Sequence, residues 1–190
     1  TKVGRKRGEK NTHEAECLPF FNLKEGNPQV EYKPFVLFVG RIEKQKGLMS
    51  LVKAFQNTDY NLKIIGFSND GYEDELKAYL NGKRHHIEFL GKMNFEQIVP
   101  YLKSCLCTVV PSEWYDNFPN VILESFAYKK AVVATNFGSL PELVRNGETG
   151  LTFNYQDVED FRSKIAYFFA HPTEAKAMGE NAFQNVQTCF

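Results

Sequence analysis

The sequence predicts an α/β fold built around a doubly wound parallel sheet. From residue 35 onward, short runs rich in β-branched and aromatic residues recur along the chain. These runs are continuously apolar, as strands that are covered on both faces should be. Segments with the apolar spacing of an amphipathic helix separate them. This alternation is typical of parallel strands joined by right-handed crossovers.

The expected elements follow one another in a regular order. Strands are expected at residues 35–39, 62–65, 87–90, 106–110 and 131–134. Helices are expected at residues 48–56, 73–80, 94–104, 119–128, 156–170 and 173–188. Asn94 is the expected N-cap of the third helix, and Pro119 suits the first turn of the fourth. Sheets of this kind bind ligands beyond the carboxyl ends of their strands, so the loops that follow the strands are the candidate site.

The chain length fits one domain, which we expect over residues 35–190. Residues 1–34 do not join the alternating pattern, and we expect them to be a linker or leader that is partly disordered. Their first ten residues are basic, and an arm that contacts phosphate or a membrane is one interpretation. A solvated end of the domain is the favoured one. The chain does not start with Met, so we expect it to be part of a longer protein.

Composition excludes several classes of function. The 23 Lys and Arg residues equal the 23 Asp and Glu residues, and this balance argues against a nucleic-acid-binding protein. No run approaches the roughly 20 apolar residues that cross a bilayer, and the first 30 residues lack the apolar core of a signal peptide. The four cysteines lack the spacing of a zinc site or a disulfide framework. A cytoplasmic protein without a bound metal is therefore expected.

The loop after the first strand is the first candidate binding segment. It contains Gly40, which lets a ligand approach the backbone, and the cations Arg41 and Lys46, which suit an anionic group such as a diphosphate. A solvated basic loop is the alternative interpretation. The segment matches neither a P-loop nor the GxGxxG pattern, so a nicotinamide cofactor is not supported.

The loop and helix after the fourth strand form the second candidate segment. An anion is attracted to the N–H groups at the start of this helix. Glu124 lies inside the apolar helix sequence VILESFA and should have a hydrogen-bonding partner. From Asp116 to Glu124 the chain would span about 12 Å if it were helical, enough to spread a ribose, a diphosphate and a sugar. Local capping or pairing of Glu124 is the alternative.

Three ordered segments resemble the C-terminal domain of retaining GT-B glycosyltransferases, specifically glycosyltransferase family four. They are FVGRIEKQKG, IEFLGKMNFEQIVPYLKSCLCTVVPS and DNFPNVILESFAYKKAVVATNFGSLPELVRNGETG, and the resemblance covers about residues 35–186. It implies a Rossmann-like doubly wound sheet that forms the C-terminal half of a GT-B fold. It also implies an enzyme of polysaccharide biosynthesis, and a UDP- or GDP-linked sugar as the donor.

The resemblance also implies roles for individual residues. Gly40, Arg41 and Lys46 would hold the donor diphosphate, and Asp116 would be catalytic at the transferred sugar. Glu124 would bind the ribose hydroxyls. The backbone at Asn117, Phe118 and Val121 would hold the distal phosphate, and residues 89–93 would lie against the base. Among the departures from the family pattern, Asp116 replaces the usual glutamate, and Ser139 replaces a glycine near the sugar.

The implied function is transfer of a hexosyl group, with retention, to a glycan or a lipid-linked acceptor. No metal and no cofactor are implied, since the chain lacks a strict DxD motif. The acceptor domain that precedes this half in the family is absent, so we expect the isolated chain to have little activity. Contact with a membrane is expected only through the full-length protein. A non-catalytic nucleotide-sugar-binding module and a GT-B epimerase or phosphorylase are the alternatives.

Overall fold

A computed structural model describes residues 34–115 and 119–189. In these residues six parallel strands form one sheet, in the order β3-β2-β1-β4-β5-β6. The strands are β1 (Phe35–Val39), β2 (Asn61–Ile65), β3 (His86–Gly91), β4 (Cys107–Val110), β5 (Val132–Thr135) and β6 (Gly150–Phe153). The helices are the 3₁₀ turn η1 (Lys44–Lys46), α1 (Leu48–Phe55), α2 (Tyr72–Leu80), α3 (Phe95–Ser104), α4 (Asn120–Ala127), α5 (Leu140–Leu143), α6 (Val158–Ala170) and α7 (Pro172–Cys189).

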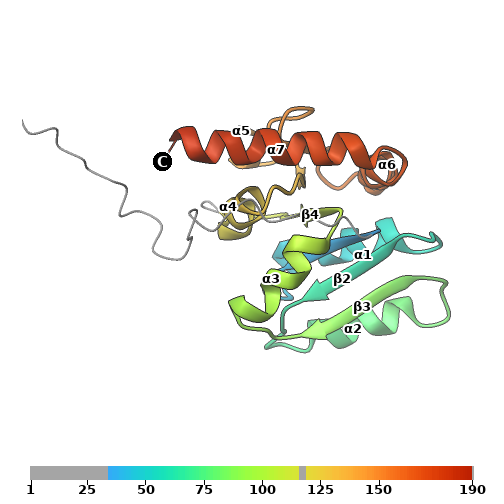
Figure 1. Cartoon of the computed structure of the whole chain (residues 1–190). Coiled ribbons are helices and arrows are strands. Elements are labelled where there is room, and N and C mark those ends of the chain that lie inside the picture. Colours follow the sequence, from blue (N-terminus) through green and yellow to red (C-terminus); the bar gives the residue numbers. More distant parts are fainter. Residues whose placement is uncertain (1–33, 116–118, 190) are drawn as a thin grey trace, which may run out of the picture.

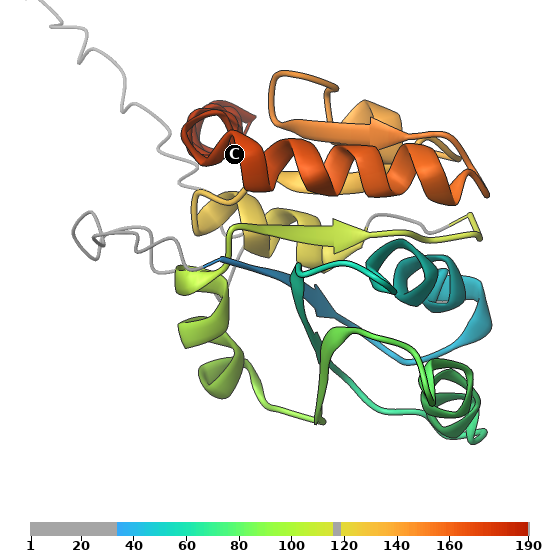
Figure 2. The same cartoon turned by 90° about the vertical axis from the view of Figure 1, so that its right-hand side faces the viewer.

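Helices cover both faces of this sheet, which confirms the doubly wound arrangement (Figures 1 and 2). One apolar cluster joins α1, α2 and α6 to the sheet, and two others join α3 and α4 to the opposite face. The long helix α7 contributes Ala175 and Met178 to the first cluster, and Ala182 and Val186 to the cluster around α4. It therefore closes the β6 edge and ties the two faces together.

The five predicted strands and six predicted helices are present, and no end differs from its prediction by more than two residues. Three short elements were not predicted, the 3₁₀ turn η1, the four-residue helix α5 and the edge strand β6. Edge strand β3 also departs from the expected full burial, since His86 and Glu88 are exposed. A strand with only one neighbour buries less of its surface, so polar residues are tolerated there.

Capping residues explain where two helices begin. Asn94 accepts a hydrogen bond from the backbone of Gln97, whose side chain accepts from the Asn94 N–H in return. This reciprocal capping box confirms the predicted N-cap of α3. Pro119 takes the N-cap position of α4 and not its first turn, because the helix begins at Asn120.

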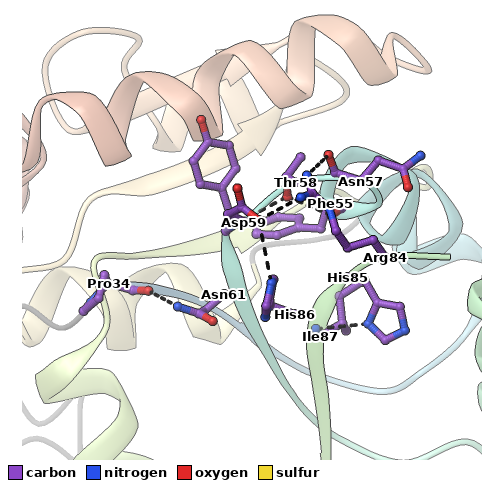
Figure 3. A network of polar contacts seen from close by, with 11 residues as sticks. Pro34, Phe55, Asn57, Thr58, Asp59, Asn61, Arg84, His85, His86 and Ile87 are labelled. Carbon is purple, nitrogen blue, oxygen red and sulfur yellow. Dashed lines mark hydrogen bonds and ion pairs between the residues drawn. The ribbon is translucent and has the colours of Figure 1, made fainter.

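The amino end of the sheet is fastened by a polar network between two turns (Figure 3). The N–H of Asn57 donates to the carbonyl of Arg84 at 2.7 Å, and the Arg84 guanidinium donates back to the Asn57 carbonyl at 3.2 Å. The Oδ1 atom of Asp59 lies 3.4 Å from a guanidinium nitrogen of Arg84 and 3.9 Å from Nε2 of His86. The His85 ring accepts a hydrogen bond from the Ile87 N–H. Both histidines therefore make local contacts at the sheet edge opposite the loops singled out above.

Lys130 is a buried cation behind β4. Its side chain is fully buried, and its ammonium donates to the carbonyl of Cys105 at 2.9 Å. Burial lowers the pKa of Lys130 from 10.5 to about 8. Burial also raises the pKa of the Cys105 thiol to about 12 and that of Cys107 well above its usual range.

The Lys130 shift predicts a contribution to stability that grows with pH. Between pH 8 and 9 the unfolded state keeps the Lys130 proton that the folded state has lost, so Lys130 adds about 1 kcal/mol to the free energy of unfolding. The unfolded thiols of Cys105 and Cys107 ionise in the same range while the buried ones stay protonated, which offsets this gain. Urea unfolding at several pH values compares the chain with Lys130→Met. Over this range the variant should lose about 1 kcal/mol relative to the chain, and an equal pH dependence of the two proteins would contradict the assignment.

Candidate functional site

The order of the sheet reverses between the neighbouring strands β1 and β4, so the loops that leave them diverge. A crevice is expected at such a switch point. The structure has a cavity of about 270 Å³ there. It is lined by Phe38, Val39, Gly40, Arg41, Lys46, Val109, Val110, Pro111, Ser112, Pro119, Asn120, Val121 and Glu124.

This cavity brings together five of the predicted site residues. Gly40, Arg41 and Lys46 come from the loop after β1, and Val121 and Glu124 come from α4. Asp116, Asn117 and Phe118 lie outside the described residues, so their predicted roles stay predictions. Residues 89–93, predicted to lie against the base, are at the end of β3 and do not line this cavity.

Close packing of two loops shapes one wall. Gly47 has the left-handed φ of +70°, and a Cβ there would come within 1.8 Å of the Pro111 carbonyl oxygen. The Glu113 N–H donates to the Gln45 carbonyl at 2.8 Å, and the Ser50 hydroxyl donates to the Glu113 carboxylate at 2.8 Å. The basic loop is therefore held against the loop after β4.

The two cations of the basic loop differ in their surroundings. Arg41 is exposed, and its guanidinium lies 2.8 Å from the carboxylate of Glu43. Glu43 also accepts a hydrogen bond from the side chain of Gln45 at 2.8 Å. Lys46 is half-buried in the cavity wall. An incoming anion would meet Lys46 inside the cavity and would compete with Glu43 for Arg41.

Helix α4 supplies the opposite wall. Its N-cap residue, Pro119, makes no side-chain hydrogen bond to the first turn, whose N–H groups form the positive end of the helix dipole. The Ser125 hydroxyl is 2.7 Å from that of Thr108 and donates to the Val121 carbonyl at 2.6 Å, which fixes α4 against β4. The half-buried Glu124 lines the cavity, and burial raises the pKa of its carboxyl.

A second cavity of about 440 Å³ lies beside α2 and β3 and is lined in part by Lys77, Lys83 and His85. It is larger and also basic, yet its setting is less suited to phosphate. The carbonyl end of α2 faces this region and repels anions. The cavity at the switch point is the better candidate for a diphosphate.

Comparison with known proteins identifies the family. The family model described as "Glycosyl transferases group 1" matches residues 20–185. The chain belongs to the group 1 glycosyl transferases. It is 34% identical to an uncharacterized glycosyltransferase, MJ1178, of Methanocaldococcus jannaschii, over 77% of this chain and 41% of that protein. It is 33% identical to the D-rhamnosyltransferase WbpZ of Pseudomonas aeruginosa, over 82% of this chain and 41% of that protein.

Solved structures agree with this assignment. Sucrose-phosphate synthase from Thermosynechococcus elongatus has a TM-score of 0.74 and 30% identity, over 83% of this chain and 41% of that one. Anabaena HepE in complex with UDP-glucose has a TM-score of 0.74 and 21% identity, over 82% of this chain and 44% of that one. The latter likeness shows the fold alone.

The glycosyl transferase chain spans about two fifths of the length of the curated relatives named above. It corresponds to the C-terminal, Rossmann-like half of the GT-B fold, as predicted. Within the described residues, every helix is too short or too polar to traverse a bilayer. The predicted cytoplasmic location and the predicted membrane contact of a longer protein stay predictions.

Proposed function

We propose that this chain is the donor-binding domain of a glycosyltransferase that moves a hexosyl group, with retention, from a nucleoside diphosphate sugar to a glycan or lipid-linked acceptor. One observation carries the proposal. A single cavity at the switch point of the sheet joins two cations, a helix N-terminus and a half-buried carboxylate. The cations and the helix N-terminus match a diphosphate, and the carboxylate matches the hydroxyls of a ribose.

The cations and α4 supply the electrostatic part of the reaction. As the bond between the anomeric carbon and the diphosphate oxygen breaks, negative charge grows on the departing diphosphate. Lys46 and the start of α4 stabilise that charge from opposite walls of the cavity. Arg41 joins them after exchanging Glu43 for phosphate. Because these groups compensate the charge, we propose a reaction without a metal ion and with no cofactor besides the donor.

The carboxylates orient the two sugars of the donor. Glu124 accepts hydrogen bonds from the ribose hydroxyls, which requires its ionised form. Burial raises the pKa of this carboxyl, so a ribose that donates two hydrogen bonds relieves an unfavourable charge. Asp116 is proposed to act at the transferred sugar. A UDP-linked donor, such as the one in the solved complex of HepE, and a GDP-linked donor are the two candidates.

Calorimetric titration with UDP, GDP and ADP tests the proposal. We expect saturable binding to one of them. Glu124→Ala should weaken that binding at least about tenfold, since a hydrogen bond to a charged group contributes about 1.5–3 kcal/mol. The same titration should show no loss of affinity for Glu148→Ala. This variant removes an exposed carboxylate in the turn before β6, at the amino end of the sheet.

Two results would count against the donor site. The first is a folded chain that binds none of the three nucleotides. The second is an equal loss of nucleotide affinity in the Glu124 and Glu148 variants. Transfer of sugar needs the acceptor side as well, and we propose that a further N-terminal domain supplies it. The chain alone should therefore bind donor without catalysing transfer.

A further inference from the structure

Three aromatic rings lie in a row where β4, β5 and β6 end, with Phe137 stacked on Tyr155 and tilted by 43° against Tyr115. The ring centroids of Tyr115 and Phe137 are 4.8 Å apart, and those of Phe137 and Tyr155 are also 4.8 Å apart. Tyr115 is 70% exposed and Tyr155 is 39% exposed. We call Tyr115, Phe137 and Tyr155 the aromatic row. Large apolar side chains gathered on the surface from three separate loops are typical of a binding site.

The fold holds this row in place. Gly138 has a φ of +60°, and a Cβ there would already touch the Tyr115 ring at 3.4 Å, so the loop after β5 passes close beneath that ring. The Asn136 N–H donates to the Phe153 carbonyl at 2.6 Å, which joins the loops after β5 and β6. Gln156, itself at a φ of +61°, donates from its side chain to the Tyr155 hydroxyl at 3.1 Å.

The three loops around the row are polar, and they contain the carboxylates of Glu113 and Asp157 but no cation. Asn136 and Ser139 lie in the loop that carries Phe137, and Asn154 and Gln156 flank Tyr155; all four are exposed. Residues 111–115, 135–140 and 153–157 contain no Lys or Arg, so a phosphate group has no cation to meet in these three loops. Aromatic faces bordered by amides and hydroxyls complement a sugar ring, which has an apolar C–H face and a rim of hydroxyls.

We propose that the aromatic row is a saccharide-binding platform beside the donor cavity, which holds further sugar units of an acceptor glycan whose reacting unit lies on the N-terminal domain. This inference rests on the proposed glycosyl transfer. The loop after β4 belongs to both sites, because Pro111 and Ser112 line the donor cavity and Tyr115 follows three residues later. A glycan stacked on the row therefore lies next to the bound donor, and the acceptor is a saccharide chain.

The single tryptophan of the chain reports on this platform. Trp114 precedes Tyr115 in the sequence and is 61% exposed, so its fluorescence is a probe of this loop. We would titrate the chain with α-1,6-mannotriose and with maltotriose. One of them is expected to give a saturating change with a dissociation constant on the order of 1 mM. Phe137→Ala and Tyr155→Ala should each weaken it about threefold to tenfold, as the loss of one aromatic ring predicts. Tyr155→Phe keeps the ring and should retain binding.

Tyr60→Ala is the matched control, since it removes one ring of the stacked pair Tyr60–Phe169 outside the row and should leave saccharide binding unchanged. Saturable nucleotide binding without any response to either saccharide would overturn the platform and leave the donor site intact. Saccharide binding without nucleotide binding would support the platform and refute the donor site. Sedimentation that shows a dimer lost in Tyr155→Ala would assign the row to contact between copies, against the proposal.

Discussion

Replacing Gly47 by alanine is expected to destabilise the chain by about 2–5 kcal/mol and to remove nucleotide binding. The left-handed backbone at this residue costs alanine about 1–2 kcal/mol. Overpacking adds about 1–3 kcal/mol, because the new methyl would meet the backbone oxygen of Pro111, which cannot rotate away. The shift that results would separate the basic loop from the loop after β4. Urea unfolding and nucleotide titration measure the two effects.

Gly71→Ala separates the two costs. Gly71 begins α2 as Gly47 begins α1, with a similar φ of +77°, but no described atom lies within 4 Å of the position that a Cβ would take. The free energy of unfolding of this variant should therefore fall only by the cost of the left-handed backbone, about 1–2 kcal/mol, and the variant should bind nucleotide normally. Equal destabilisation of the two variants would show that the contact between Gly47 and Pro111 does not shape the site.

Lys46→Ala is expected to weaken nucleoside diphosphate binding about tenfold to hundredfold. Lys46 lies in the cavity wall, where a charge-assisted hydrogen bond to phosphate contributes about 1.5–3 kcal/mol. Arg41→Ala should weaken binding less. Arg41 is exposed and already paired with Glu43, and exchanging one exposed ion pair for another gains little. Calorimetry at constant ionic strength measures both.

Lys103→Ala is the matched control for net charge. Lys103 is exposed in the last turn of α3, outside the residues that line the donor cavity, so its loss should change affinity by less than about twofold. Equal losses for Lys46→Ala and Lys103→Ala would mean that overall charge, and not the cavity, attracts the nucleotide. A larger loss for Arg41→Ala than for Lys46→Ala would contradict the proposed ranking.

Most of the fold could be predicted because buried parallel strands leave a strong signal. β1 and β5 contribute residues that are almost all buried, and their apolar runs are visible in the sequence. β6 has only four residues and begins with Gly150, so its pattern is too short to recognise. Gly150 is required because a Cβ there would come within 2.0 Å of the Val132 carbonyl oxygen, a constraint that only the paired strands reveal.

The site could be predicted in part for a topological reason. Arg41 and Glu124 are far apart in the sequence, yet parallel strands bring their loops to one edge of the sheet. The pairing of Arg41 with Glu43 was not foreseen, since loop conformation decides it. The aromatic row was missed because Phe137 and Tyr155 belong to different loops and share no periodic pattern.

The central claim is that a nucleoside diphosphate binds between the loop after β1 and the start of α4. Amide hydrogen exchange with and without the nucleotide selected by calorimetry tests it most directly. We predict slower exchange at residues 40–47 and 119–124 and no change around the second cavity at Lys77, Lys83 and His85. Protection confined to that second cavity, with the switch-point loops unaffected, would contradict the account.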